Sequence, residues 1–479
     1  MTRINTNVQN LIAKRTLDTN NMSLTTALNR LSTGLRINTG KDDPAGLIAS
    51  EGLRASKVAI NGAINNARRA DQVVGIAEAG LGEINALLLE LEHLIDTTAN
   101  EAGLSAAERE ANQLQIDTIL SSINRIAGVT AFNGEKLLNG NYDFITSGVN
   151  SSHLTGLQVN SAKIPLNTNR DVNLQMVSSA TVAQVVGAGA GASGELTAGT
   201  TLEIRGRYGT DVLSFASGTS LADVALAIGA AQDLTGVTAT ASGTQLVLTS
   251  TEVGSGAMVG VRVLNSAGSP GDFTVTGGDI AYGLDPEVTI NGARATTRGL
   301  EASVISGTLS LELQLDEAFA RMTAGATTTT FTITGGGAKF AISPEVGLIG
   351  QETIGIGSVN TGSLGDHVLG RLSSLGRGQA NDIQSGNYHN AQRILRKAQE
   401  QISSLRGRIG AFQKDTLETT INSLLIAFEN TAAAESAIRD ADFAVETSSM
   451  TRAQILVQSN LATLKMANQI PQNALSLLS

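Results

Sequence analysis

The sequence lacks cysteine and tryptophan altogether. Without cysteine the chain cannot form disulfides, use a thiol nucleophile, or bind a zinc ion or iron–sulfur cluster through thiolates. Aromatic residues make up only 3% of the 479 residues, so pockets lined by aromatic rings are not a main feature. No HExxH motif occurs in the sequence. We therefore expect no cofactor and no metal site.

Basic residues are also few, with 33 Lys and Arg against 43 Asp and Glu and a net charge of −10. Such a balance argues against a nucleic-acid partner, which requires a basic surface, and against an anionic membrane surface. The long uncharged stretch between Asp171 and Glu195 is rich in Gly, Ser and Ala, so it is not a membrane span. The polar N-terminus has no hydrophobic core of a cleaved signal peptide.

The composition changes twice along the chain. Residues 1–140 and 361–479 are rich in Leu, Ile, Ala, Asn and Glu and contain one proline each, Pro44 and Pro471. Residues 141–360 are rich in Gly, Thr, Ser and Val and hold the other four prolines. Because the two ends resemble each other and not the middle, we expect a multidomain α+β protein in which a β-rich part is inserted between helical ends.

The helical signal is strongest in a run of apolar or small residues spaced alternately three and four apart. This run comprises Ile60, Ala63, Ala67, Ala70, Val74, Ala77, Leu81, Ile84, Leu88, Leu91 and Ile95. Such spacing predicts a long helix packed lengthwise on other helices, as in a coiled coil. Ser105 and Glu108 form a capping-box pattern that begins the next helix. A matching stripe near the other end contains Ile402, Leu405, Ile409 and Phe412, and Leu417 continues it after a shift of phase.

The two termini carry narrower apolar stripes. One comprises Leu24, Leu28, Leu31 and Leu35, and the other Met450, Val457, Leu461 and Leu464. Neither stripe has a partner next to it in the sequence, so each helix must pack against a distant segment or another chain. We expect the termini to pair with each other and then with neighbouring subunits, and to be largely disordered in the free monomer.

The middle contains short alternating segments typical of antiparallel strands. They include residues 201–205, 245–249, 259–264 and 287–290, the last followed by the turn signal Asn291-Gly292. Residues 221–231 predict one short helix. The run of glycine and alanine at 187–194 has GxGxxG-like spacing, but without a βαβ context it is interpreted as a flexible loop. Asp42 and Asp43 are interpreted as helix-capping residues rather than as a metal or acid pair.

Several segments at both ends resemble bacterial flagellins. The N-terminal segments are INTN (4–7), LSTGLRIN (31–38), KDDPAGL (41–47) and FNG (132–134). The C-terminal segments are IGAFQ (409–413), ADFAVE (441–446), QIL (454–456) and ANQIPQ (467–472). Residues 199–265 also resemble a small module of flagellins and hook-associated proteins.

The resemblance implies a structural, non-enzymatic subunit of a helical homopolymer that serves swimming motility. Residues 1–38 with 446–479 would form the inner tube. Residues 39–140 with 360–445 would form the helical outer tube, and 141–359 the variable β-rich surface. Lys41, Asp42, Asp43 and Pro44 would connect the layers. Val74, Leu81, Ile84, Leu88, Leu91, Ile402, Leu405, Ile409 and Phe412 would pack the helical layer, and the two terminal stripes would direct self-assembly.

The resemblance further implies partners and a location. Besides copies of itself, the chain would meet an export chaperone, the filament cap and hook-associated proteins, with no nucleic acid and no membrane. It would lie outside the cell in the filament, exported without a cleaved signal peptide. Family members detected by innate receptors carry Gln, Arg and Glu where this chain has Leu89, Glu90 and His93, so we expect weak receptor activation. The alternatives are a hook–filament junction protein, or a surface adhesin acting through residues 141–359.

Overall fold

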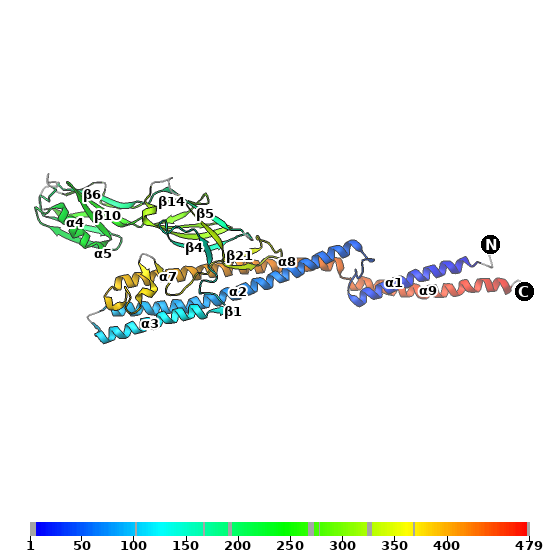
Figure 1. Ribbon diagram of the computed structural model, residues 1–479. Helices are drawn as coiled ribbons and strands as arrows, with labels where there is room; N and C mark the ends of the chain where they lie inside the picture. The colour runs from blue at the N-terminus through cyan, green and yellow to red at the C-terminus, as the bar shows by residue number, and fades with distance from the viewer. Residues whose placement is uncertain are drawn as a thin grey trace. The chain divides into compact units, whose positions relative to one another are not determined.

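The computed structural model describes residues 6–100, 103–165, 168–189, 194–266, 273–276, 278–322, 328–366 and 369–476. Two compact units divide the chain. The first comprises residues 1–69, 341–346 and 415–479, and the second comprises 70–340 and 347–414. Both ends of the sequence therefore belong to the first unit, and the β-rich middle belongs to the second (Figure 1). The helical ends and inserted β-rich part confirm the α+β organisation expected from the sequence.

Long helices form the first unit. They are α1 (Val8–Thr33), the first half of α2 (Pro44–Thr98), α8 (Thr419–Arg439) and α9 (Phe443–Ser476). Helix α2 is longer than the predicted run from Ile60, because Pro44 suits the first helical turn and the Asp43 carboxylate accepts a bond from the Gly46 amide at 2.9 Å. A small core forms where Ile60, Ala63 and Ile64 meet Leu424.

A helical core occupies part of the second unit. The second half of α2 packs with α3 (Ala106–Val129) and α7 (Tyr388–Ala411) around one large cluster of aliphatic side chains. The Ser105 hydroxyl and the Glu108 carboxylate form the reciprocal bonds of a capping box, as predicted. Among the described helices, only α2 is long and apolar enough to span a bilayer by composition, and its apolar side contributes to this core instead.

Helix α7 continues through a wide turn, Phe412–Glu418, with π-helical hydrogen bonding. A π-turn inserts an extra residue into the helical repeat. The extra residue explains why the apolar stripe shifts its phase on the helix between Phe412 and Leu417. Phe412 is partly buried against the helical core, whereas Leu417 is fully buried.

Two sheets build the larger β region of the second unit. One has the order β15-β14-β5-β19-β3 and the other β16-β17-β18-β4. The strands of the first are β3 (Phe144–Ser147), β5 (Arg170–Ser178), β14 (Glu287–Ile290), β15 (Ala293–Arg294) and β19 (Thr328–Gly336). Those of the second are β4 (Leu154–Ala162), β16 (Thr296–Arg298), β17 (Glu301–Ile305) and β18 (Leu309–Leu315). Their inner faces share one core that includes Leu174, Leu311 and Phe331. The predicted Asn291-Gly292 turn joins β14 to β15, with positive φ at both residues.

A smaller β module is inserted between β5 and β14. Its sheets have the orders β12-β6-β10-β9 and β13-β11-β7-β8. The strands are β6 (Val182–Gly189), β7 (Thr200–Gly206), β8 (Thr210–Phe215), β9 (Val237–Ser242), β10 (Gln245–Val253), β11 (Met258–Ser266), β12 (Phe273–Thr276) and β13 (Ile280–Tyr282). The predicted helix is α4 (Leu221–Ala230), capped by the Ser220 hydroxyl, and a short α5 (Gln232–Thr235) follows. The core of the module extends beyond 199–265, from Ala183 to Phe273.

The interpretation of residues 187–194 as a flexible loop is wrong for its first three residues. Gly187, Ala188 and Gly189 belong to β6 and pair with β10 or β12. A Cβ at Gly187 would collide with the ring of Phe273, so the missing side chain makes room for that ring. Residues 190–193 lie outside the described part of the chain.

Short elements complete the structure. They are the two-stranded pairs β1 (Ala131–Phe132) with β2 (Glu135–Lys136), β20 (Ala338–Ala341) with β21 (Gln351–Ile354), and β22 (Gly365–Asp366) with β23 (Gly370–Arg371), and the helical turns α6 (Glu317–Ala320), η2 (Leu372–Leu375) and η3 (Ile383–Ser385).

Candidate assembly surfaces

The terminal helices α1 and α9 lie side by side and run antiparallel (Figure 1). Near one end of the pair, the Asn7 side-chain amide donates to the carbonyl of Ala467 at 2.8 Å. Near the other end, the Arg30 guanidinium donates to the Glu446 carboxylate at 2.9 Å. The pairing of the two termini that the stripes predict is thus present within one chain.

Small residues form the seam between α1 and α9. Among the described residues, its buried apolar members are Ala13 and Ala27 on α1, and Ala453 and Ala467 on α9. These alanines allow close helix approach but bury little apolar surface. The sequence analysis missed these alanines because it traced the stripes through leucine and other large aliphatic residues. The same three-and-four spacing also continues through alanine and asparagine.

The predicted assembly residues fall into two groups. Leu24, Leu31, Leu35, Met450, Val457 and Leu464 are half-buried. Leu28 and Leu461 lie away from the seam, and each keeps 46% of its surface exposed. An intramolecular role therefore does not explain why leucine occupies these two positions.

Helix α9 carries a shallow groove with a mainly apolar lining. Phe443, Ile455 and Leu456 line it together with threonines and Arg452. Phe443 is 70% exposed and Ile455 is 61% exposed. Large aliphatic and aromatic groups gathered on one exposed helix are typical of a surface that is covered by another chain.

The predicted packing residues of the helical layer share one core. Val74, Leu81, Ile84, Leu88, Leu91, Ile402 and Ile409 are fully buried, Leu405 is nearly so, and Phe412 packs against them. Polar side chains reinforce the contact of α2 with α7, since the Arg406 guanidinium donates to the Glu78 carboxylate at 2.7 Å. This core is complete within a single chain.

The connection between α1 and α2 is held by its two aspartates. The Asp42 carboxylate accepts bonds from the Thr39 and Asn38 amides, and these bonds hold its pKa below the usual value. Asp43 caps α2, in line with the capping interpretation, but that interpretation is wrong for Asp42, whose carboxylate bonds the loop before the helix. A Cβ at Gly46, in the first turn of α2, would meet the ends of the Asp43 and Ile37 side chains, so a larger residue there would require those side chains to shift. Lys41 is exposed.

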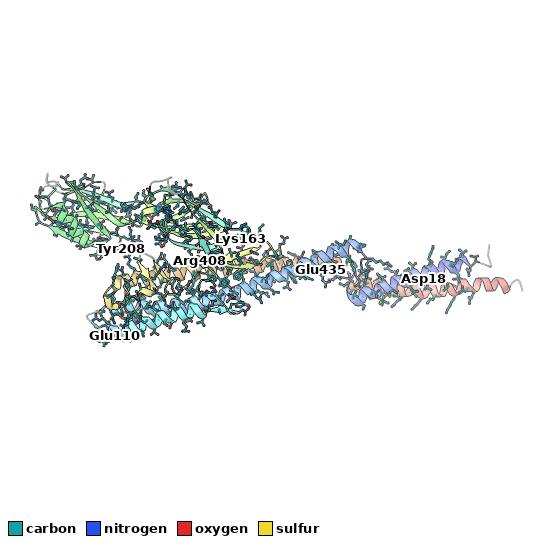
Figure 2. The ribbon with its side chains drawn as sticks, viewed as in Figure 1. Asp18, Glu110, Lys163, Tyr208, Arg408 and Glu435 are labelled. Atoms are coloured by element: carbon teal, nitrogen blue, oxygen red, sulfur yellow. The ribbon has the colours of Figure 1, made fainter. Side chains whose placement is uncertain are left out.

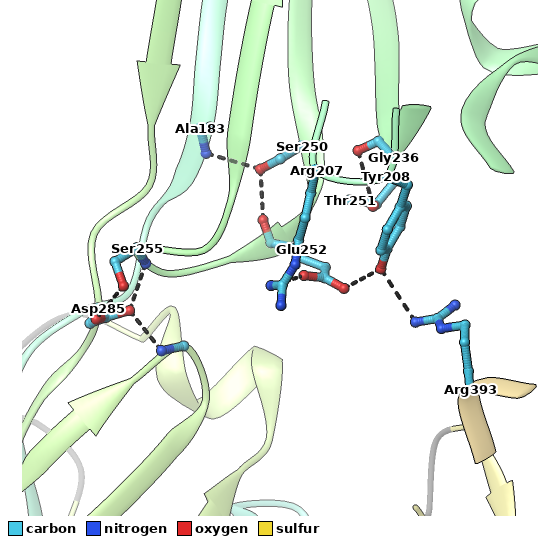
Figure 3. A network of polar contacts seen from close by, with 11 residues as sticks. Ala183, Arg207, Tyr208, Gly236, Ser250, Thr251, Glu252, Ser255, Asp285 and Arg393 are labelled. Atoms are coloured by element: carbon cyan, nitrogen blue, oxygen red, sulfur yellow. Dashed lines mark hydrogen bonds and ion pairs between the residues drawn. The ribbon is translucent and has the colours of Figure 1, made fainter. Parts of the chain in front are cut away.

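A polar network links the small β module to helix α7 (Figure 3). The Tyr208 hydroxyl bonds the Glu252 carboxylate, and the Arg393 guanidinium donates to the same hydroxyl at 3.3 Å and lies 5.3 Å from the ring centroid. Burial and the Glu252 carboxylate raise the pKa of Tyr208. Tyr208 therefore stays protonated at neutral pH and can donate to Glu252.

Asp285 fastens the module to the larger β region (Figure 3). Its carboxylate accepts bonds from the amide and hydroxyl of Ser255 and from the Gly299 amide. Burial raises the pKa of Asp285, but these bonds outweigh burial and hold it below its usual value. The module thus has a polar attachment at its base, beside an apolar one in which Val253 of β10 and Val182 of β6 pack against the core of the larger β region.

A polar cavity of about 710 Å³ separates β4 and β18 from α7. Arg408 (Figure 2) faces it with Nε and Nη1 buried and unpartnered among the described residues, and burial lowers its pKa. Burial raises the pKa of the Asp143 carboxyl on the same cavity. The cavity is large enough to hold water molecules, and the charged side chains of Arg408 and Asp143 can hydrogen-bond to them.

Comparison with known proteins decides between the alternatives. The model of the bacterial flagellin N-terminal helical region matches residues 4–143, and that of the C-terminal helical region matches 393–478. A third model, the flagellin hook IN motif, matches 201–252. The chain belongs to the bacterial flagellin family. It is a structural subunit of the flagellar filament, an extracellular appendage that serves motility.

Curated relatives match over almost the whole length. The chain is 29% identical to flagellin of Salmonella rubislaw, 27% to flagellin B of Helicobacter pylori and 27% to B-type flagellin of Pseudomonas aeruginosa, with 99% of each chain covered in all three comparisons. These full-length matches favour the filament subunit over the junction or adhesin alternatives. A solved structure of FliC from Burkholderia pseudomallei is 15% identical and covers 72% of this chain and 98% of that one, with a TM-score of 0.24.

Flagellins are structural proteins. Within the described ranges, no group of three or more His, Cys, Asp or Glu side chains is placed to hold a metal ion. His389 is at the start of α7, and His367 lies outside the described residues.

Proposed function

We propose that residues 1–38 with 446–479 form the inner layer of the filament. The observation that carries this proposal is the open apolar side of the α1–α9 pair. Leu28 and Leu461 are 46% exposed although the helices are already paired through alanines. In a polymer these side chains would be buried against neighbouring copies, which offsets the entropy lost when the helices become ordered.

The surrounding layer would comprise residues 39–140 with 360–445. Its support is the complete apolar core of α2, α3 and α7, which gives a rigid body that does not need a neighbour to fold. Residues 141–359 would face outward, since β sandwiches with cores of their own can vary without disturbing a helical contact. The chain would bind other flagellar components, namely an export chaperone, the cap and hook-associated proteins, and leave the cell without a cleaved signal peptide.

The assembly step would couple polymerisation to folding of the terminal helices. Among the described residues, the buried apolar side chains of the α1–α9 seam are alanines, which bury too little apolar surface to hold two isolated helices in water. We therefore expect the termini to be largely disordered in free monomers and helical in filaments. An asymmetric head-to-tail contact that does not close on itself then yields an open helical polymer.

Hydrogen exchange on monomers and on seeded filaments tests this proposal. Amides of α1 and α9 should exchange quickly in the monomer and become protected on polymerisation, whereas amides of α2 near Leu88 should be protected in both states. Termini that stay unprotected in filaments would contradict the inner-layer assignment. In a reporter-cell assay, the isolated protein should activate the innate flagellin receptor weakly. Potent activation would refute the expectation of weak receptor binding.

A further inference from the structure

Four Asn-Gly steps in the chain offer the same chemistry in different settings. Asparagine is a chemically labile residue, because the backbone nitrogen of the next residue can attack its side-chain carbon. Glycine favours this attack, since it has no Cβ to obstruct it and its backbone bends freely. A large apolar residue precedes the asparagine in every case, so the local sequences match closely. The steps are Asn61-Gly62, Asn133-Gly134, Asn139-Gly140 and Asn291-Gly292.

Two of these steps are restrained by local structure. Asn61 lies within α2, where helical hydrogen bonds fix the backbone on both sides of the step. The Asn139 side-chain oxygen accepts a bond from the Asn141 amide at 3.1 Å. In both cases existing bonds must break before the side-chain carbon can meet the next backbone nitrogen.

Asn133 and Asn291 occupy the same kind of hairpin turn but differ in their side-chain contacts. Each has a φ of 50°, and the glycine that follows has a φ of 89° in the first turn and 80° in the second. Both asparagines are exposed. The Asn291 oxygen accepts from the Asn173 amide at 2.8 Å, and its side-chain nitrogen donates to the Asp171 carbonyl at 3.4 Å. The Asn133 side chain has no hydrogen bond to any described residue, so nothing holds its carboxamide in place.

The backbone around Asn133 also offers little resistance to the attack. The Gly134 amide has no hydrogen-bond acceptor in the described part of the chain. The hairpin itself is short, since β1 and β2 contribute two residues each, and few bonds oppose the rotation that brings the nitrogen to the side-chain carbon. We propose that Asn133 is a modification site, at which water converts the side-chain amide to aspartate and isoaspartate in the folded protein.

The conversion needs water as its only co-reactant. The Gly134 nitrogen bonds to the side-chain carbon of Asn133, its proton passes to the leaving nitrogen, and ammonia departs. Water then opens the succinimide ring that has formed. Attack at the side-chain carbonyl gives aspartate, and attack at the main-chain carbonyl gives isoaspartate. Either product carries one more negative charge than asparagine.

The two products differ in their effect on the hairpin. Aspartate keeps the original backbone, whereas isoaspartate adds a methylene to the main chain before Gly134. The longer turn no longer fits the pairing of Phe132 with Glu135. Phe132 packs against the helical core, and Leu137 beyond the hairpin is fully buried in it. Isoaspartate should therefore loosen the chain at the edge of this core.

Mass spectrometry of the aged protein tests the proposal at all the Asn-Gly steps together. The full chain is kept folded in mildly alkaline buffer, sampled over time and digested in acid, which stops the reaction. Asn133 should convert several times faster than Asn291, which has the same turn and serves as the matched control. Conversion at Asn291 that is as fast as at Asn133 would overturn the proposal.

The same chain unfolded in denaturant supplies the reference rates. The steps should then convert at similar rates, because their local sequences match and the structure that separates them is lost. A lead of Asn133 that persists unchanged in denaturant would overturn the structural argument, as would an Asn133 that converts only when the chain is unfolded. Reaction in water that carries heavy oxygen should label both aspartate and isoaspartate, and aspartate alone would contradict the succinimide route.

Discussion

The core of α2, α3 and α7 and the pair formed by α1 and α9 show the same three-and-four spacing with different outcomes. In the former, Leu81, Leu88 and Ile402 are fully buried within one chain. In the latter, the buried apolar side chains among the described residues are alanines, and Leu28 and Leu461 each remain 46% exposed. A heptad-like stripe therefore does not by itself say whether its partner lies in the same molecule.

The difference teaches where stability resides. A closed aliphatic core stabilises the second unit within one chain, whereas we propose that the terminal pair, with its alanine seam, depends on contacts with other copies. Mutations in the two regions should therefore have separable effects, one on unfolding of the monomer and one on polymerisation.

The largest expected effect is on the closed core. Leu88→Asp places a carboxylate among fully buried aliphatic residues and should destabilise the second unit by about 4 kcal/mol or more. Thermal unfolding followed by circular dichroism measures this. Leu89→Asp is the matched control, because its side chain is 55% exposed, and it should unfold within about 0.5 kcal/mol of the unmodified chain. Equal effects of the two substitutions would contradict the core assignment.

The terminal pair should respond in the opposite way. Leu28→Asp or Leu461→Asp should leave the main thermal transition unchanged and abolish seeded polymerisation, because each charge would have to be buried between subunits. Light scattering measures polymerisation, and Leu28→Met should restore it because the side chain keeps its apolar volume. Normal filaments from either aspartate variant would place these leucines outside the assembly surface.

A smaller effect is expected at the start of α3. Ser105→Ala removes the hydroxyl that accepts from the Glu108 amide at 3.2 Å and should cost about 1 kcal/mol of unfolding free energy. Ser105→Asp keeps a capping acceptor and should cost much less. Chemical denaturation of both variants compares them, and an unchanged midpoint for the alanine variant would show that the cap contributes nothing.

The smallest effect should appear at the connection before α2, as a dependence on pH. The bonds from the Thr39 and Asn38 amides lower the pKa of Asp42. The contribution of the Asp42 carboxylate to the stability of this connection is therefore fully present above the unfolded pKa near 3.8. It is lost as the pH falls through the lower pKa of the folded state. Hydrogen exchange at Thr39 should be slow at neutral pH, and Asp42→Asn should speed it. Equal rates of amide exchange at Thr39 in both proteins would show that Asp42 does not stabilise this connection.

Much of the fold could be predicted because local signals agreed with the tertiary structure. The Ser105–Glu108 capping box, the Asn291-Gly292 turn and the stripe from Val74 to Ile95 each specify geometry within a few residues. The buried helical core followed from that stripe, since its positions belong to the same cluster as buried residues of α3 and α7.

Other features depended on long-range packing. The terminal seam contains Ala13 and Ala453. Their small side chains contribute little to the hydrophobic periodicity, which the nearby leucines dominate. Gly187 belongs to a strand because Phe273, distant in the sequence, covers it. Which of these surfaces meets another chain is a property of the assembly and not of local sequence.

Electron microscopy of the purified protein after seeded polymerisation tests the central claim most directly. The account predicts long uniform tubes, in which helical averaging places α1 and α9 around the central channel and the β-rich residues on the outside. Protein that stays monomeric on seeds, or tubes with the terminal helices on the outer surface, would contradict it.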